Sequence, residues 1–212
     1  MAQTTMRTYV YVDGFNLYYG ALKDTAWKWI DLPALFATIL QSRHDILSVK
    51  YFTARLSGRP DDQSKPQRQD TYIRALQRYR PEVEVYFGHF LTNRVRMPLV
   101  RPACNQRTAQ VIKTEEKGSD VNLAVHLLND GWLDSYDCAV VVSNDSDIAE
   151  SMRLVKDQHG KRIGLITPGT RSQSRQLLAH ADFARRIRSN ALRRSQLPDP
   201  IPDTTIRKPP RW

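Results

Sequence analysis

Four aspartates in this sequence stand where the chain changes from apolar to polar residues. Asp13 follows the run TYVYV, and Asp145 and Asp147 follow VVV within VVVSNDSDIAE, residues 140–150. Asp120 lies near the start of the helical pattern SDVNLAVHLL. Carboxylates that share a crevice repel one another and lose their charge unless a cation neutralises them. The pattern therefore predicts a site for a hard divalent cation such as Mg²⁺, which prefers oxygen ligands.

A cation held by these four carboxylates supports hydrolysis. Bound Mg²⁺ polarises a phosphoryl oxygen and lowers the pKa of a coordinated water. The sequence offers no Ser-His-Asp or Cys-His arrangement, and its five histidines show no ligand spacing. It has no GxGxxG and no GxxxxGK[ST] motif, so dinucleotide and P-loop binding have no support. An acidic cluster in a basic chain without another nucleophile indicates metal-assisted phosphodiester hydrolysis.

The elements that position these residues alternate between strand and helix. Apolar or alternating runs predict strands at 8–12, 46–55, 83–90, 137–143 and 161–169. Helical patterns lie between them, and the pattern at 119–130 has Ser119 as its expected cap, Gly131 as its stop and an apolar face of Val121, Ala124, Val125 and Leu128. This order predicts an α/β fold, a three-layer α/β/α sandwich around a mostly parallel sheet.

Ligands of such sheets bind at the carboxyl ends of the strands. Asp13, Asp145 and Asp147 follow strands and are expected at that edge, and Asp120 joins them if the chain returns there. Each aspartate alone has an ordinary structural alternative as a turn or helix-capping residue. Another alternative, an aspartyl-phosphate mechanism, requires a second aspartate two residues after Asp13, where this chain has Phe15.

The positive charge is unevenly placed. The chain of 212 residues has a net charge of +10, and residues 171–212 hold ten Lys and Arg against three Asp. Residues 91–114 break the periodicity and predict an extended or hairpin insertion that faces substrate, or else a solvated loop. A cationic surface attracts nucleic acid. The arginines expected to bind a phosphate backbone are Arg94, Arg96, Arg101, Arg107, Arg185 and Arg186.

Three blocks of the chain resemble the motifs of the NYN domain, a branch of the PIN-like ribonuclease superfamily. They are YVDGFNLYYG at 11–20, KGSDVNLAVHLL at 117–128 and VVVSNDSDIAE at 140–150. The resemblance spans about residues 7–190. It implies a five- or six-stranded parallel sheet, RNA cleavage, and Mg²⁺ or Mn²⁺ bound by Asp13, Asp120, Asp145 and Asp147. It also implies that Asn16 holds a carboxylate or water, that Lys117 lies near the phosphate, and that Ser143 and Asn144 support the ligands.

The expected protein is thus a metal-dependent ribonuclease with an NYN domain at 1–190 and a basic, Pro-rich tail at 191–212. The alternative is a catalytically silent RNA-binding or scaffolding module of the same fold. A homodimer that completes the binding surface is a possible assembly. Cys104 and Cys138 form no disulfide framework, and no run is long and apolar enough to span a membrane, so a reducing, cytoplasmic location is expected.

Overall fold

A computed structural model describes residues 5–57, 62–103, 106–170 and 172–212 of the chain. Within these ranges seven strands form one sheet in the order β4-β3-β2-β1-β5-β6-β7. Neighbouring strands are parallel except β3 and β4. The predicted α/β class and mostly parallel sheet are confirmed. The strands are β1 (Met6–Asp13), β2 (His44–Ala54), β3 (Val83–Ala103), β4 (Gln106–Lys117), β5 (Cys138–Val142), β6 (Arg162–Thr167) and β7 (Phe183–Arg186).

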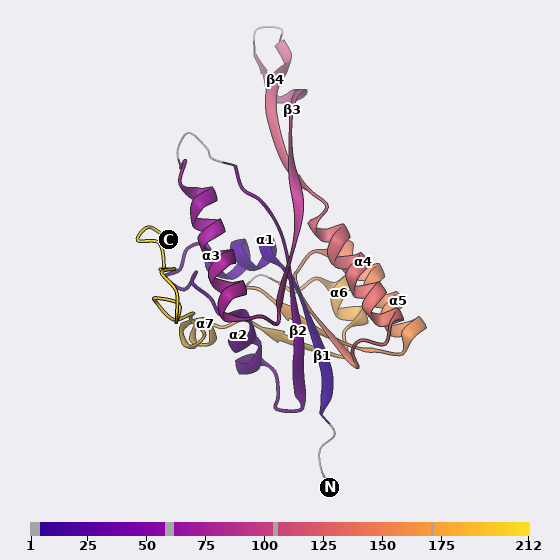
Figure 1. The fold of residues 1–212 in the computed structure, drawn as a ribbon. Helices are drawn as coiled ribbons and strands as arrows, with labels where there is room; N and C mark the ends of the chain where they lie inside the picture. The colour runs from indigo at the N-terminus through magenta and orange to yellow at the C-terminus, as the bar shows by residue number, and fades with distance from the viewer. Residues whose placement is uncertain (1–4, 58–61, 104–105, 171) are drawn as a thin grey trace.

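Helices cover both faces of the sheet (Figure 1). Strand side chains alternate between faces, so Val10 and Val12 belong to one hydrophobic core while Tyr11 between them belongs to the other. The first core is covered by α1 (Gly14–Leu17), the π-helix η1 (Tyr18–Leu22), α2 (Leu32–Ile39), α3 (Lys65–Tyr79) and α7 (Ser189–Arg194). The second is covered by α4 (Ser119–Trp132), the short helix η2 (Ser146–Ile148), α5 (Ala149–His159) and α6 (Arg175–His180).

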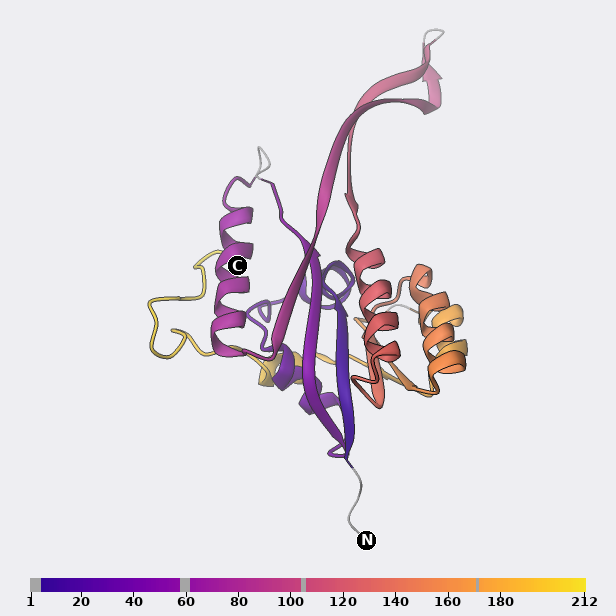
Figure 2. The same ribbon diagram turned by 45° about the vertical axis from the view of Figure 1, so that its right-hand side comes forward.

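The insertion predicted at 91–114 is a long β-hairpin. Strand β3 pairs with β2 through Gly88 and then continues out of the sheet, where β4 returns antiparallel to it. The hairpin extends far beyond the body of the domain (Figure 2). At its base the two strands cross closely, since a Cβ at Gly88 would lie 2.5 Å from the carbonyl oxygen of Lys117. The hairpin therefore delivers the chain to the start of α4.

Helix α4 differs from the prediction in its cap and its buried face. Gly118, in the left-handed conformation, precedes the helix, and the Glu116 carboxylate accepts a hydrogen bond from the Ser119 backbone N–H at 3.1 Å. The predicted face is wrong: Leu123 and Leu127 are fully buried, while Val121 and Val125 are 59% and 57% exposed. Gly131 lies inside the helix instead of ending it.

Burying that face also buries Asp130, whose carboxylate pairs with the Lys50 ammonium at 2.6 Å. The Tyr11 hydroxyl donates to the same carboxylate oxygen at 2.7 Å. Both side chains of the ion pair are almost completely buried between α4 and the sheet. A buried charge requires such partners, and Lys50 and Tyr11 supply them on the buried face of α4.

The C-terminal segment, expected to be a tail, packs against the domain. Leu197 and Ile201 are buried in the first hydrophobic core. The Trp212 ring meets the Trp29 ring edge-on at a centroid distance of 5.8 Å. Prolines interrupt regular structure here, but the apolar residues between them still fill the surface beside α2 and α3. The sequence did not predict this packing, because the proline-rich segment shows the period of neither a helix nor a strand.

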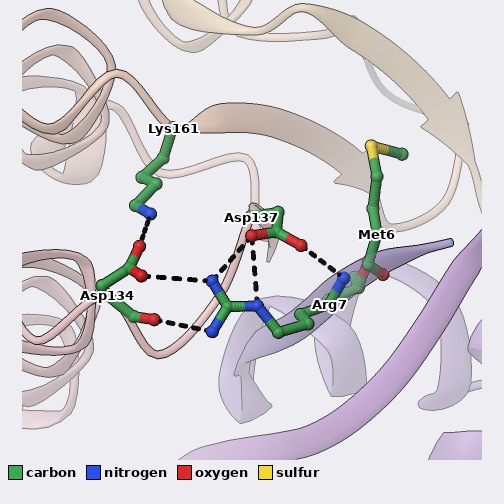
Figure 3. Close-up of polar contacts among 6 residues, drawn as sticks. Met6, Arg7, Asp134, Asp137 and Lys161 are labelled. Atoms are coloured by element: carbon green, nitrogen blue, oxygen red, sulfur yellow. Dashed lines mark hydrogen bonds and ion pairs between the residues drawn. The ribbon is translucent and has the colours of Figure 1, made fainter. Parts of the chain in front are cut away.

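An ion-pair network joins the beginnings of β1 and β5 (Figure 3). The Arg7 guanidinium donates to Asp137 at 2.7 Å and to the carbonyl oxygen of Asp134 at 2.9 Å. The backbone N–H of Arg7 donates to the other Asp137 oxygen at 2.9 Å, and Lys161 pairs with Asp134. These contacts fix the register of β1 against β5 at the end of the sheet opposite to the predicted site.

Two smaller expectations concern the cysteines and membrane association. Cys138 is a buried free thiol, and Cys104 lies outside the described residues. Among the helices that the structure describes, none has the length and apolar character needed to cross a membrane.

Candidate active site

The carboxyl ends of β1 and β5 meet at the point where the sheet changes direction. From β1 the chain builds β2 and β3 on one side, and from β5 it builds β6 and β7 on the other. Val12 pairs with Val142, so the next residues along each strand, Asp13 and Ser143, lie side by side. Open α/β sheets bind their ligands in the crevice at this switch point.

Asp13 is held by hydrogen bonds on both carboxylate oxygens. One oxygen accepts from the Asn16 backbone N–H at 2.9 Å. The other accepts from the Asn16 side-chain amide at 2.8 Å and from the Ser143 hydroxyl at 2.9 Å. The residue is only 8% exposed. Burial raises the pKa of Asp13 despite these hydrogen bonds, and the nearby charge of Asp145 raises it further.

Asn16 joins the first motif to the third. Its side-chain oxygen accepts from the Asn144 backbone N–H at 3.3 Å while its amide nitrogen donates to Asp13. Asn144 in turn donates to the carbonyl oxygen of Ser172 at 3.0 Å and accepts from the Ser174 backbone N–H at 2.8 Å. The loop before α6 is thereby attached to the crevice, and the Asp13 carboxylate has a fixed orientation.

Asp145 and Asp147 follow Ser143 at the same edge. The Asp145 backbone N–H donates to the Ser143 hydroxyl at 3.0 Å, so one hydroxyl links Asp145 to Asp13. The Asp145 side chain also caps η2 by accepting from the Asp147 backbone N–H at 3.1 Å. Asp13 caps α1 in the same way. The capping roles are therefore real, and they hold both carboxylates at the crevice. Asp147 itself is exposed.

Asp120 and Lys117 lie at the base of the hairpin. Asp120 is half-buried in the first turn of α4, which contacts η2, and its carboxylate accepts from the Val121 backbone N–H at 2.9 Å. Lys117 is the last residue of β4, and its ammonium nitrogen lies 3.8 Å from a carboxylate oxygen of Glu115. Among the described side chains, no hydrogen bond or ion pair joins Asp120 or Lys117 to Asp13, Asp145 or Asp147.

Whether a divalent cation fits this site depends on the oxygen donors that the aspartates supply. In the described ranges no group of three or more His, Cys, Asp and Glu side chains converges closely enough to hold a metal ion. The four aspartates thus do not form a ready-made cage. Mg²⁺ however needs only one or two carboxylates, because waters and substrate phosphates complete its octahedron. Asp13 and Asp145, linked through Ser143, supply donors of that kind, and a cation there would offset their repulsion.

The predicted RNA-binding arginines lie at opposite edges of the sheet. Arg94, Arg96, Arg101 and Arg107 are exposed on the hairpin that extends from one edge. Arg185 and Arg186 are exposed on β7, the strand at the other edge. The structure does not bring the two groups together, and β1 and β5, which carry Asp13 and Asp145 at their ends, lie between them.

Sequence reasoning missed two residues that shape the crevice. Gly14 begins α1 against β2, and a Cβ there would lie 2.7 Å from the carbonyl oxygen of Phe52 and 2.8 Å from Cζ of Tyr51. Burial raises the pKa of the Tyr51 hydroxyl, with a smaller contribution from the negative charge of Asp13. The run of aromatic residues after Asp13 in YVDGFNLYYG was the available signal for a ring-lined wall.

Comparison with known proteins now adds to this geometry. A family model described as the NYN domain matches residues 7–187 of the chain. A curated protein, 6-hydroxy-3-succinoylpyridine 3-monooxygenase HspA of Pseudomonas putida, is 34% identical over 238 residues, which cover 98% of this chain and 75% of that protein. A solved structure of a protein of unknown function from Vibrio parahaemolyticus has a TM-score of 0.56 and 18% identity, over 90% of this chain and 98% of that one. The last likeness concerns the fold alone.

Proposed function

The chain belongs to the NYN domain family, a PIN-like nuclease family, and we propose that it is a metal-dependent ribonuclease that hydrolyses RNA phosphodiester bonds. The observation that carries the proposal is the placement of two carboxylates at the switch point of the sheet, where the Ser143 hydroxyl bonds to the Asp13 carboxylate and to the backbone N–H of Asp145. Family membership supports the reaction class, and the oxygen donors support a hard cation.

The residues of the chain have separate roles in this proposal. Asp13 and Asp145 hold Mg²⁺ or Mn²⁺, with Asp120 and Asp147 as further ligands of one or two ions. Asn16, Ser143 and Asn144 orient the two principal carboxylates. When bound, the cation supplies a Lewis acid that polarises the scissile phosphate and activates water. Lys117 and the arginines of the hairpin and of β7 position the RNA backbone without reading its sequence.

An Asp145→Asn variant tests the proposal. Labelled single-stranded RNA and matching DNA are incubated with wild type or variant in Mg²⁺, Mn²⁺ or EDTA. We expect cleavage of RNA only with metal, and its loss in the variant. Asp157→Asn, which removes a carboxylate on the surface of α5, serves as the matched control and should cleave like wild type. Equal cleavage by wild type and Asp145→Asn would contradict the proposal.

Thermal unfolding with and without metal gives a readout that does not depend on turnover. A ligand that binds only the folded state raises the unfolding temperature, and the increase grows with the logarithm of the ligand concentration above its dissociation constant. We expect Mg²⁺ or Mn²⁺ to stabilise wild type and Asp157→Asn and to leave Asp145→Asn unchanged. RNA binding that persists in EDTA, with no cleavage in either metal, would instead favour the silent RNA-binding or scaffolding module.

The similarity to a protein named as a monooxygenase favours one further candidate, hydroxylation of a hydroxypyridine. Such a reaction needs O₂ and a two-electron donor. Incubating the protein with 6-hydroxy-3-succinoylpyridine, NADH and a flavin, and following NADH oxidation and product by mass spectrometry, tests it. Hydroxylated product formed by wild type and by Asp145→Asn alike would assign the activity to a different part of the chain from the carboxylate pair.

A further inference from the structure

Two adjoining hollows form a groove beside the candidate active site. The first, of about 230 Å³, lies between α1, η1, β2 and α3, and the second, of about 270 Å³, continues to the base of the hairpin at Phe90. They share Phe15, Tyr19, Leu56 and Lys65 in their walls. We call the two together the aromatic groove. Its ring-bearing walls include Phe15, Tyr18, Tyr19, Tyr51, Tyr72 and Trp212.

The aromatic groove lies next to the carboxylate pair, because two of its wall residues lie close to Asp13. Phe15 lies two residues after Asp13, at the start of α1. Tyr51, also in the wall, packs so closely on Gly14 that a Cβ there would lie 2.9 Å from the Tyr51 hydroxyl oxygen. The groove therefore lies beside Asp13, although neither Asp13 nor Asp145 is among its lining residues.

Among the groove cations that the structure describes, Lys65 forms neither an ion pair nor a hydrogen bond, although the Asp62 carboxylate is close enough to feel its charge. Arg68 is engaged by Asp62, and Lys28 donates to the carbonyl oxygen of Trp212 at 3.1 Å. Lys65 lines both hollows, is half-buried, and forms no ion pair with any residue that the structure describes. Its ammonium group gives the junction of the two hollows a positive charge that a phosphate complements.

The indole nitrogen of Trp212 adds a second unused group. It is buried and has no hydrogen-bond acceptor among the described residues. Unpaired buried donors are uncommon and cost free energy. Trp212 lines the first hollow, so this donor belongs to a residue of the groove wall.

We propose that the aromatic groove binds unpaired nucleotides of the RNA next to the scissile phosphate, with bases on its aromatic rings and the backbone on Lys65. Aromatic platforms combined with a cation are the means by which proteins hold single strands without reading their sequence. Bases in a duplex are already stacked and paired, so they cannot enter hollows of this size. This inference rests on the proposed ribonuclease function.

Binding without cleavage tests the groove separately from catalysis. The anisotropy of a fluorescein-labelled single-stranded oligoribonucleotide, and of its duplex with the complementary strand, is measured in EDTA. Tyr19→Ala removes a ring that is 55% exposed, and Lys65→Gln removes the available charge. Trp132→Ala on α4 and Lys156→Gln on α5 are the matched controls, because both residues lie outside the groove. Circular dichroism checks that every variant is folded.

We expect Tyr19→Ala to bind the single strand about tenfold more weakly, the loss of roughly one stacked base. Lys65→Gln should bind it more weakly than Lys156→Gln, and Trp132→Ala should bind like wild type. The duplex should bind weakly to all of them. Equal binding of the single strand by wild type, Tyr19→Ala and Lys65→Gln would overturn the inference, as would equal affinity for duplex and single strand.

Two further arms separate the alternatives. If the groove variants lose single-strand binding but wild type never cleaves, the groove assignment stands and the ribonuclease proposal fails. If wild type cleaves and the groove variants bind and cleave normally, the groove assignment alone fails.

Unlabelled 6-hydroxy-3-succinoylpyridine is added as a competitor. Tight binding of this small aromatic acid that Tyr19→Ala abolishes, with RNA binding unaffected, would overturn the nucleotide assignment in favour of a metabolite.

Discussion

The Ser143 hydroxyl donates to the Asp13 carboxylate at 2.9 Å across the paired ends of β1 and β5. The same hydroxyl accepts a hydrogen bond from the Asp145 backbone N–H at 3.0 Å. One small side chain thereby connects the Asp13 carboxylate to the backbone of Asp145, 132 positions further along the chain. This link makes the geometry of the candidate site depend on the register of the two strands.

Replacing Ser143 with alanine should destabilise the protein. The change leaves Asp13 with fewer donors and the Asp145 N–H without its acceptor, which costs about 1–3 kcal/mol. Losing a donor to the charged form also raises the pKa of Asp13 further. Urea unfolding measures the free energy, with Ser42→Ala, an exposed serine, as the control. Equal stability of the two variants would contradict this role.

Gly14→Ala should disturb the site more than its size suggests. The added Cβ meets the backbone of Phe52, which cannot rotate away, so α1 must shift with Phe15 and Asn16. Overpacking of this kind costs about 1–3 kcal/mol. Gly160→Ala is the control, since its φ of +63° costs backbone energy but no atom lies within 4 Å. Both variants should lose stability in urea, and only Gly14→Ala should also lose RNA cleavage and metal stabilisation.

The buried pair of Lys50 and Asp130 should be far more sensitive than any surface pair. Lys50→Met or Asp130→Asn leaves one group without its charge partner and should cost about 3–5 kcal/mol. The double variant should cost less than the sum of the two, because no unpaired charge remains. Urea unfolding of the four proteins completes the cycle. Arg153→Ala, which breaks an exposed pair, is expected to cost much less than either buried variant.

Asp137 should give the protein a measurable sensitivity to acid. The Arg7 side chain that hydrogen-bonds to it lowers the pKa of Asp137 below its ordinary value of 3.8. The pair therefore contributes stability above that value, and this contribution is lost as the pH falls through the lower pKa of the folded state. Both side chains are more than 40% exposed, so the contribution is about 1 kcal/mol or less.

Urea unfolding at a series of pH values checks this dependence. Asp137→Asn should be less stable than wild type at neutral pH, and the difference between their free energies of unfolding should become smaller below about pH 4. If that difference in free energy stayed constant down to the lowest pH measured, the charge of Asp137 would contribute nothing to stability.

The hairpin arginines should determine how RNA binding responds to salt. Arg94 and Arg96 are two residues apart on β3 and so face the same side of the strand. If both contact phosphates, Arg94→Ala/Arg96→Ala should reduce the slope of log affinity against log salt by about 1.4 for a single strand. Arg78→Ala/Arg153→Ala loses the same charge from α3 and α5 and should leave the slope unchanged. Equal slopes in both double variants would place the RNA elsewhere.

The sequence by itself determined the α/β class and the position of Asp13 and Asp145 at the ends of strands. Both follow from local pattern: an apolar run ends at a polar residue, and parallel strands bring their carboxyl ends to one edge. It also determined the stop of α5 at Gly160, which takes the left-handed conformation that glycine permits.

Only the tertiary structure decided which strands are neighbours and which helix faces are buried. Pairing of β1 with β5 brings Ser143 to Asp13, and no local pattern encodes a contact between residues so far apart. Helix α4 carries more than one apolar stripe, and in the folded protein Leu123 and Leu127 are buried with Asp130 while Val121 and Val125 stay exposed. The packing of the proline-rich C-terminal segment also depends on tertiary structure. Its apolar side chains contact a surface that exists only after α2 and α3 have assembled.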